Sequence, residues 1–222
     1  MQFGSRQAAP TDTEQMIPIS KLVIATGNAK KLREFERLLA PLSIEVFAQS
    51  AFDVPEAPEP HCTFLENALA KARNAAHHTG LPSLADDSGI CVHALGGDPG
   101  VNSAYYAGSQ KSDADNNAKL IANLKDVSDR GAHYTAVLAL VLREDDPEPI
   151  IAEGRWYGEV IDVPRGSGGF GYDPHFLDPE LGLTGAEMPL DQKGARSHRG
   201  RALVKLLAEM QQRYGVVNAS RT

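Results

Sequence analysis

The sequence contains little cysteine, and what it has forms no metal-binding or disulfide pattern. Cys62 and Cys91 are the two cysteines among 222 residues, and no CxxC pair is present. Disulfide-stabilised domains need more cysteines, and zinc sites need companion ligands at set spacings. The sequence therefore argues against both classes and predicts a protein of a reducing, intracellular compartment, the cytoplasm.

Long apolar runs are also absent. A membrane-spanning helix needs about 20 mainly apolar residues, and no segment approaches that length. The first twenty residues have neither a basic start nor an apolar stretch, so they do not look like a secretory signal. With 42% hydrophobic and 23% charged residues, the composition predicts a soluble globular protein without a membrane partner.

The length predicts one domain, or one domain with two lobes. Residues 1–20 are polar and contain proline, which indicates a disordered extension or a mis-assigned start. We expect a single domain over residues 21–215 and a flexible tail over residues 216–222.

An excess of positive charge is missing too. The formal net charge is -7, whereas binding to a nucleic-acid polymer depends on clustered Lys and Arg. DNA and RNA are therefore not expected as partners. A small nucleotide is not excluded, because local cations and a metal ion can neutralise its phosphates.

Apolar periodicity alternates between strand and helix along the chain. Strands are predicted at residues 22–25, 44–48, 83–85, 134–142 and 150–161. The last two are joined by an acidic turn and indicate a hairpin. Helices are predicted at residues 32–39, 63–80, 112–124 and 203–210. The pattern predicts an α/β fold with a mixed sheet and no internal repeat.

Two adjacent carboxylates, Asp86 and Asp87, follow an apolar strand and precede a Ser-Gly turn in the segment LADDSG. Neighbouring like charges repel, whereas a hard divalent ion such as Mg²⁺ favours both in the ionised form. The alternative is a solvated acidic turn, since Asp, Ser and Gly are ordinary turn residues.

The segment TGNAKK at residues 26–31 lies where a strand leads into a helix. Free backbone N–H groups and the helix dipole make such a junction suitable for phosphate. It is not a Walker A loop, because GxxxxGK[ST] is absent. An Asn cap followed by lysines on a solvated face is the alternative.

A glycine-rich loop surrounds one aromatic residue in the segment GSGGFGYD at residues 166–173. Glycines allow the backbone to approach a flat ligand, and Phe170 offers a stacking face that suits a nucleobase. The alternative is a glycine-rich hairpin or bulge with Phe170 in the core.

Other charged residues have ordinary interpretations when taken alone. The segment SHRG at residues 197–200 precedes the last helix, which indicates helix entry with an exposed cation. Lys71 belongs to a charged helix face, and Glu59 to a proline-rich loop. Lys193 alone is unremarkable.

Five segments occur together in order: TGNAKK, TFLENALAKA, LADDSG, GGFGYDP and SHRG. Together they resemble the inosine triphosphate pyrophosphatase family over about residues 22–214, and five ordered motifs are far more specific than one. The resemblance implies an elongated mixed β-sheet with flanking helices, forming two lobes around a central nucleotide cleft. It also implies Mg²⁺-dependent hydrolysis of ITP, dITP and XTP to monophosphate and pyrophosphate, and a homodimer.

The resemblance further implies a role for each matching residue. Asp87 and Lys71 are the expected catalytic residues, and Asp87 and Glu59 the expected metal ligands. Asp87 acts either as base toward water or as metal ligand. The expected substrate-binding residues lie in the matching segments: Thr26, Gly27, Asn28, Ala29, Lys30, Lys31, Ser88, Phe170, Gly171, Tyr172, Asp173, Lys193, His198 and Arg199.

For base selectivity, the resemblance implies that Lys193, His198 and Arg199 reach the purine edge. Cationic donors suit a 6-oxo acceptor and would be left unpaired against the 6-amino group of adenine. One position departs from the family, because Tyr105 stands where an arginine is common. Any phosphate contact of that arginine is therefore in doubt.

Other functions remain open at this point. A nucleotide kinase is disfavoured, because the Walker A loop is missing. A non-catalytic nucleotide-binding module is the main alternative, and the presence of Asp87, Lys71 and Glu59 argues against it. The related septum-inhibitor-type pyrophosphatases share the fold, but SHRG and GGFGYD favour the purine branch.

Overall fold

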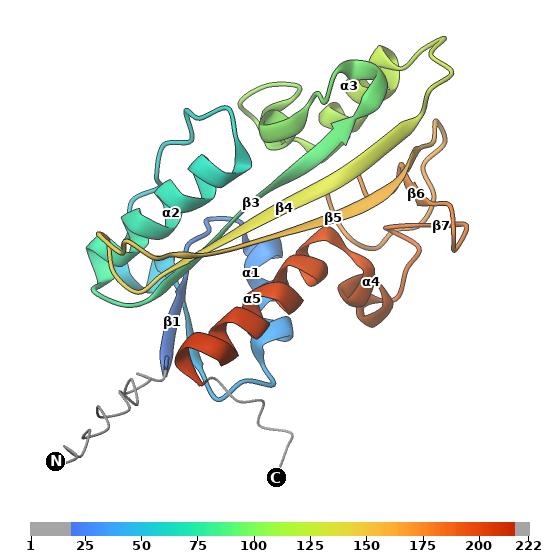
Figure 1. Cartoon of the computed structure of the whole chain (residues 1–222). Coiled ribbons are helices and arrows are strands. Elements are labelled where there is room, and N and C mark those ends of the chain that lie inside the picture. The colour runs from blue at the N-terminus through green and yellow to red at the C-terminus, as the bar shows by residue number, and fades with distance from the viewer. Residues whose placement is uncertain (1–18, 216–222) are drawn as a thin grey trace, which may run out of the picture.

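The computed structural model describes residues 19–215, which form a seven-stranded sheet with helices on both faces (Figure 1). The predicted extension, except for Ile19 and Ser20, and the predicted tail lie outside the described residues. The strands are β1 (Lys21–Ile24), β2 (Glu45–Ala48), β3 (Ser83–Val92), β4 (Gly131–Val141), β5 (Ile150–Val160), β6 (Phe176–Asp178) and β7 (Leu183–Thr184). The helices are α1 (Ala29–Leu39), α2 (Phe64–Thr79), α3 (Asp113–Asn123), α4 (Leu190–Arg196) and α5 (His198–Tyr214), with short 3₁₀ helices η1 (Gln49–Phe52), η2 (His93–Leu95) and η3 (Gly100–Tyr105).

The sheet is mixed, with strand order β2-β1-β3-β4-β5-β6-β7. β1 is parallel to β2 and to β3, whereas the strands from β3 to β7 pair antiparallel. The parallel pair β1–β2 is joined by α1, since parallel strands need a crossover connection. The predicted α/β class, mixed sheet and β4–β5 hairpin are confirmed.

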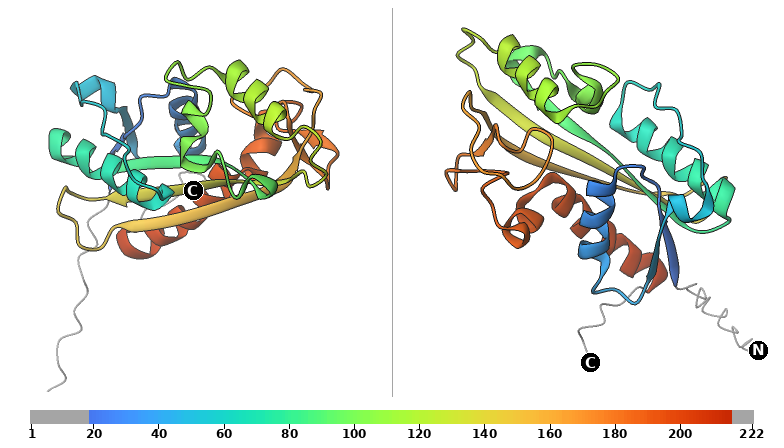
Figure 2. Two further views of the ribbon diagram at one scale, coloured as in Figure 1. Left: turned by 90° about the horizontal axis from the view of Figure 1, so that it is seen from above. Right: turned by 180° about the vertical axis from the view of Figure 1, so that it is seen from behind.

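Helices cover both faces of the sheet (Figures 1 and 2), and the side chains that pack on the two faces differ in size. α2 lies close to β3 and β4 through small residues that include Ala68 and Ala72. α1 and α5 cover the opposite face through larger residues such as Phe35 and Leu206. At the far end of the long strands, a third cluster surrounds Trp156. Separate cores at the two ends of β3–β5 give the elongated sheet and its two lobes.

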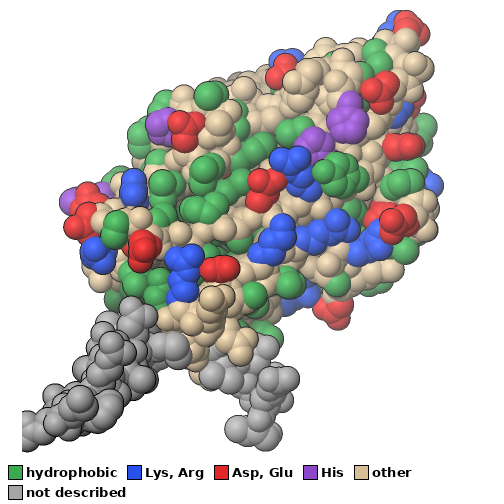
Figure 3. All heavy atoms as spheres, in the orientation of Figure 1, with side chains coloured by type: hydrophobic (Ala, Val, Ile, Leu, Met, Phe, Trp, Pro, Cys, Tyr) green, Lys and Arg blue, Asp and Glu red, His purple; other side chains and the backbone are tan. Residues whose placement is uncertain are grey.

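Two basic side chains of α5 bind the open edge of β5, and Figure 3 shows Lys and Arg side chains gathered on the face of the molecule that carries α5. β6 pairs with β5 only at Glu159 and Val160. Arg201 donates to the carbonyl of Arg155 at 3.0 Å, and Lys205 donates to the carbonyl of Glu153 at 2.7 Å. These contacts satisfy backbone groups that an edge strand leaves unpaired.

Helix starts and ends follow local sequence signals. Asn28 caps α1 by accepting from the backbone N–H groups of Lys30 and Lys31. Thr63 caps α2 through Glu66 N, while the Glu66 carboxylate binds the Thr63 hydroxyl. Gly80, at φ 64°, ends α2, because glycine adopts this left-handed conformation without strain. Within residues 19–215, none of the helices has the length and apolarity needed to cross a bilayer.

The Ser-Gly turn predicted after Asp87 is wrong, because β3 continues without interruption to Val92. Ser88 and Gly89 pair with Ala136 and Thr135 of β4. Long antiparallel pairing overrides the turn propensity of these residues. The acidic pair therefore lies within a rigid central strand rather than on a loop.

β6, β7 and α4 have no counterpart in the sequence prediction. They span three, two and seven residues, which is too short for apolar periodicity to be recognised. Tertiary contacts therefore define these elements. α4 matters for the site, because it carries Lys193.

Candidate active site

Two cavities meet beside β3, at the end of β1 and the start of α1. They share Asn28, Lys31, Ser88 and Ala104. We call the first the carboxylate cavity; its lining includes Thr26, Gly27, Glu56, Glu59, Lys71, Asp87, Tyr105 and Lys111. We call the second the aromatic cavity; its lining includes Ser103, Asp113, Tyr134, Phe170, Gly171, Tyr172, Asp173, Lys193, His198 and Arg199.

Lys71 joins the two acidic residues of the carboxylate cavity. Its Nζ lies 2.7 Å from Asp87 Oδ1 and 2.9 Å from Glu59 Oε2. Asn67, one helical turn earlier on α2, donates to Asp87 Oδ2 at 3.4 Å and exchanges hydrogen bonds with the backbone of His61. α2 thus fixes both the central strand and the loop that carries Glu59.

Burial and charge set different protonation tendencies within this group. Burial raises the pKa of Asp87 to about 6, against the attraction of Lys71. Burial alone would also raise the pKa of Glu59, but Lys71 lowers it below its usual value. Burial would lower the pKa of Lys71, but Asp87 and Glu59 raise it. Lys71 therefore stays charged, while Asp87 can exchange a proton near neutral pH.

Asp86 faces the other side of β3, as strand alternation requires. Lys31 Nζ lies 2.7 Å from Asp86 Oδ2, and the Arg199 guanidinium and Ser88 hydroxyl also donate to it. Burial would raise the pKa of Asp86, yet Arg199 and Lys31 hold it far below its usual range. Asp86 is therefore a permanently ionised anchor for two cations.

The carboxylate cavity suits a hard divalent cation. Glu59 and Asp87 offer oxygen donors to it, and Glu56 also lines it. In residues 19–215, no ready-made group of three or more His, Cys, Asp or Glu side chains has a metal-binding arrangement. Mg²⁺ commonly uses one or two carboxylates and completes its octahedron with water and phosphate oxygens. The donor set fits Mg²⁺ on these terms.

Only some residues of the TGNAKK segment line the two cavities. Thr26, Gly27, Asn28 and Lys31 line the carboxylate cavity. Ala29 and Lys30 lie outside the linings of both cavities. Lys30 instead binds Asp113 at 2.7 Å.

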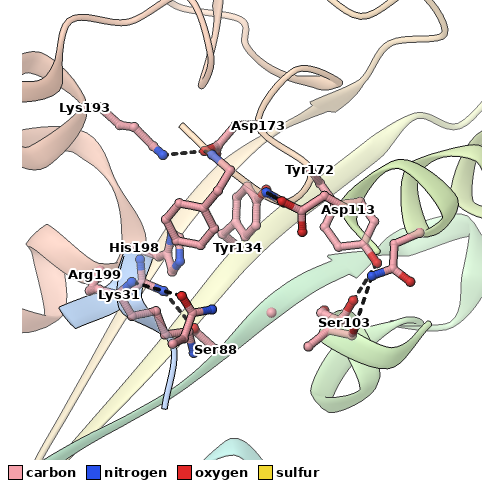
Figure 4. Close-up of a pocket in the computed structure, with 16 residues that line it drawn as sticks. Lys31, Ser88, Ser103, Asp113, Tyr134, Tyr172, Asp173, Lys193, His198 and Arg199 are labelled. Atoms are coloured by element: carbon pink, nitrogen blue, oxygen red, sulfur yellow. Dashed lines mark hydrogen bonds and ion pairs between the residues drawn. The ribbon is translucent and has the colours of Figure 1, made fainter. Parts of the chain in front are cut away.

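Three cations lie near the Phe170 ring in the aromatic cavity, and Figure 4 shows two of them, Lys193 and Arg199, at this cavity. Lys193 Nζ lies 5.3 Å from the ring centre, and Lys30 and Arg199 each lie 5.7 Å away. Asp173 accepts from Phe170 N at 2.7 Å and also binds Lys193. The loop is therefore folded around a carboxylate that presents both the ring and the Lys193 ammonium to the cavity.

A second anchor holds this loop against α1 and α3. Asp113 Oδ2 accepts from Gly171 N at 3.1 Å and from Lys30 Nζ. Asn117 donates to Gly171 O at 2.8 Å, and Tyr172 donates to Ser103 O at 2.8 Å. The sequence analysis missed Asp113 and Asn117, although both lie on one face of the start of α3.

The SHRG segment begins α5 and is buried. Ser197 is the N-cap, and Arg199 is only 3% exposed, so the expected exposed cation is wrong. Arg199 is held by Glu34, Asp86 and Ser88. Carboxylates brought from α1 and β3 stabilise a charge that helix-entry statistics would place in water.

His198 differs from the cationic donor that the sequence analysis expected. Burial and then the Arg199 charge place its pKa well below the usual value, so the imidazole is neutral. Its ring stacks on Tyr134 with centroids 4.6 Å apart. Among the described residues, His198 Nδ1 and Arg199 Nε have no hydrogen-bond partner. Tyr134 gave no sequence signal, since it lies in an apolar strand.

Known proteins resemble this chain over most of its length. The model of the Ham1 family matches residues 22–209. The dITP/XTP pyrophosphatase of Ralstonia nicotianae is 60% identical over 193 residues, covering 86% of this chain and 96% of that protein. A protein of the same name from Nitrosomonas europaea is 59% identical over 189 residues, covering 85% and 93%.

Solved structures agree with the fold. A HAM1 protein from Coxiella burnetii superposes with a TM-score of 0.82 at 45% identity, covering 87% of this chain and 100% of that one. The Ham1 protein of Staphylococcus aureus gives a TM-score of 0.78 at 36% identity, covering 86% and 98%.

Proposed function

The chain belongs to the Ham1 family and is a nucleoside triphosphate pyrophosphatase, and on this premise we propose that it hydrolyses ITP, dITP and XTP to the monophosphate and pyrophosphate. The resemblance inferred from the five sequence segments is thereby confirmed at the level of the family. Removing non-standard purine nucleotides from the nucleotide pool is the biological role that follows.

The observation that carries this proposal is the position of Lys71 between Asp87 and Glu59, next to a cavity with an aromatic ring. The shared residues Lys31 and Ser88 join the two cavities. A nucleoside triphosphate has the matching parts, because its base is flat and its phosphates are anionic. We assign the base to the aromatic cavity and the phosphates to the carboxylate cavity.

Hydrolysis requires an attacking water and a stabilised leaving group. Asp87 accepts a proton from the water, and the water oxygen attacks the α-phosphorus. The bond between the α-phosphorus and the oxygen that bridges to the β-phosphorus breaks, and pyrophosphate leaves. Lys71 and Lys31 offset the charge that develops on the phosphates. Alternatively, Asp87 acts mainly as a ligand to the metal ion beside it.

We propose Mg²⁺ as the cofactor, held by Asp87 and Glu59. When bound, it neutralises phosphate oxygens and makes the attacking water more acidic. Lys71 binds both Asp87 and Glu59, so Mg²⁺ held by these carboxylates would share them with Lys71. With metal and phosphates bound, Lys71 would exchange a hydrogen bond to one of these carboxylates for one to a phosphate oxygen.

Base selection rests on donors around Phe170. The Lys193 ammonium lies over the Phe170 ring, 5.3 Å from its centre, and offers a donor to a 6-oxo group. Arg199 offers its unpartnered Nε. An adenine 6-amino group would leave these buried donors unpaired, at a cost of about 1–3 kcal/mol per group. We also propose a cytoplasmic homodimer that binds a small nucleotide and no nucleic-acid polymer.

A substrate panel tests the proposal. ITP, XTP, GTP, ATP and CTP are incubated with and without Mg²⁺, and pyrophosphate and orthophosphate are measured separately. We expect pyrophosphate from ITP and XTP in the presence of Mg²⁺, and a loss of at least about 100-fold in Asp87→Asn. Orthophosphate with a diphosphate product would contradict the assigned bond, and nucleotide binding without turnover would indicate a binding module.

A further inference from the structure

The cations of the carboxylate cavity differ in whether they are already neutralised. Lys31 is bound to Asp86 and Lys71 to both Asp87 and Glu59. The side chains of these two lysines are only 16% and 14% exposed. Each one therefore has to share its charge with a carboxylate when a phosphate enters.

Lys111 is a third cation in this lining, and neither the sequence motifs nor the proposed reaction uses it. It lies in the turn between η3 and α3, at φ 53°. Its Nζ lies 4.7 Å from the centre of the Tyr105 ring. In the described part of the chain, no carboxylate lies within 4.0 Å of this ammonium. The Lys111 charge is thus held by an aromatic face and stays free for another anion.

The carboxylate cavity needs a cation that no carboxylate neutralises if it is to bind a polyanion. Glu56, Glu59 and Asp87 line the cavity together with Lys31, Lys71 and Lys111, so acidic and basic side chains are balanced before a polyanion binds. A cation held by a π face keeps its hydrogen-bond donors available, whereas one in a salt bridge does not. A side-chain hydrogen bond with Tyr105 contributes most to the raised pKa of Lys111, and the charges of Glu56 and Glu59 raise it further.

We propose that Lys111 binds the triphosphate chain of the substrate at the mouth of the carboxylate cavity and that Tyr105 positions it. The inference rests on the proposed function, because it takes the carboxylate cavity to hold the phosphates. It assigns Tyr105, where the resemblance led us to expect an arginine, a role as the support of a neighbouring cation. The phosphate-binding charge then comes from residue 111.

Lys111→Met tests this, since methionine keeps the length and removes the charge. Lys119→Met is the control, because Lys119 also lies over a tyrosine ring, 4.5 Å from the centre of Tyr106, donates to Tyr106 O at 2.6 Å and lies outside both cavities. We expect KM for ITP to rise about 10-fold in Lys111→Met, the lower end for a charge-assisted hydrogen bond, since the ammonium is exposed. Lys119→Met should match the wild type, and Lys111→Arg should retain most of the affinity.

Tyr105 is tested by Tyr105→Leu, which removes the aromatic face and leaves Lys111 in place. KM should rise by about 3-fold with kcat nearly unchanged, the range of an exposed cation–π contact. In the Lys111→Met background the same change should have no further effect. An additional loss there would mean that Tyr105 acts independently of Lys111 and would overturn its positioning role.

Calorimetry with inorganic triphosphate separates this inference from the proposed function. Lys111→Met should weaken triphosphate binding about 10-fold relative to Lys119→Met, and the difference should shrink as salt screens the exposed charge. Equal binding by the two variants would overturn the role of Lys111, even if the wild type hydrolyses ITP. A wild type that binds triphosphate through Lys111 and releases no pyrophosphate would contradict only the proposed function.

Discussion

Asp86 and Asp87 are sequence neighbours with opposite electrostatic environments. Asp86 is buried against Lys31 and Arg199, and its pKa is held far below the usual range. Burial raises the pKa of Asp87 to about 6 despite the attraction of Lys71. Ionised Asp86 therefore stabilises the fold. Ionised Asp87 is destabilised by burial, and this favours binding of a proton or a metal ion.

Asp87→Asn should stabilise the metal-free protein at neutral pH. A raised pKa means that the wild type loses stability as pH rises from about 4 through about 6, and Asn lacks this loss. Urea denaturation in EDTA should show a gain on the order of 2 kcal/mol at pH 7.5 that disappears near pH 4. A variant less stable than wild type at every pH would show that attraction to Lys71 outweighs burial.

Asp86→Asn should act in the opposite direction. It leaves Lys31 and Arg199 without a buried carboxylate, which should lower the free energy of unfolding at pH 7 by about 3 kcal/mol. A depressed pKa gives stability that is present above about pH 4 and lost as pH falls further. The difference between this variant and wild type, measured by urea denaturation, should therefore shrink in acid. A constant difference would assign the loss to packing.

At the scale of the elements, the central strand β3 contributes side chains to the walls of both cavities. Gly89 permits η3 to lie directly on β3, because a Cβ at this position would overlap Gly100 O and Ser103 Oγ. Ser103 also accepts from Ile90 N at 2.9 Å. η3 supplies Ser103, Ala104 and Tyr105 to the cavity walls, so close strand–helix contact sets the width of the site.

Gly89→Ala should displace η3 and impair both stability and turnover. We expect a loss of about 2–3 kcal/mol in the free energy of unfolding, the range for added volume in a tightly packed place. Gly96→Ala is the control, since its Cβ would meet nothing within 4 Å and only its φ of +65° is unfavourable. That variant should lose about 1 kcal/mol and keep its kcat. Equal effects would mean that η3 adjusts without loss.

At the scale of the whole molecule, the proposed binding mode divides recognition between the two cavities. The glycine-rich loop and α4 bring Phe170 and Lys193 to the aromatic cavity, whereas α2 and β3 bring Lys71 and Asp87 to the carboxylate cavity. Ser88 belongs to the linings of both cavities, and Figure 4 shows it at the aromatic cavity. In the proposed mode, one nucleotide spans both cavities and contacts groups from both sets of elements.

Phe170→Ala should separate base binding from phosphate binding. Loss of the stacking face should raise KM for ITP about 10- to 100-fold, from about 1–3 kcal/mol per stacked base. The inhibition constant of inorganic triphosphate should remain that of the wild type, because this ligand lacks a base. Steady-state inhibition measurements give both values, and a parallel change in the two would show that the loop also shapes the carboxylate cavity.

The sequence by itself determined the features that depend on neighbouring residues. The helices predicted at residues 63–80 and 112–124 begin at the caps Thr63 and Ser112, Gly80 ends the first of them, Asn28 caps α1, and the predicted β4–β5 hairpin forms. These signals act within one helical turn or one hairpin, so short-range sequence is sufficient. The ordered motifs also indicated the family.

Only the tertiary structure decided the electrostatics of the site. Asp87 meets Lys71 from 16 positions away, and Asp86 meets Arg199 from 113 positions away. The same packing buries Arg199, makes His198 neutral and keeps Ser88 and Gly89 in a strand. A pKa depends on burial and on charges brought close by folding, and neither is written in the residues beside the titrating group.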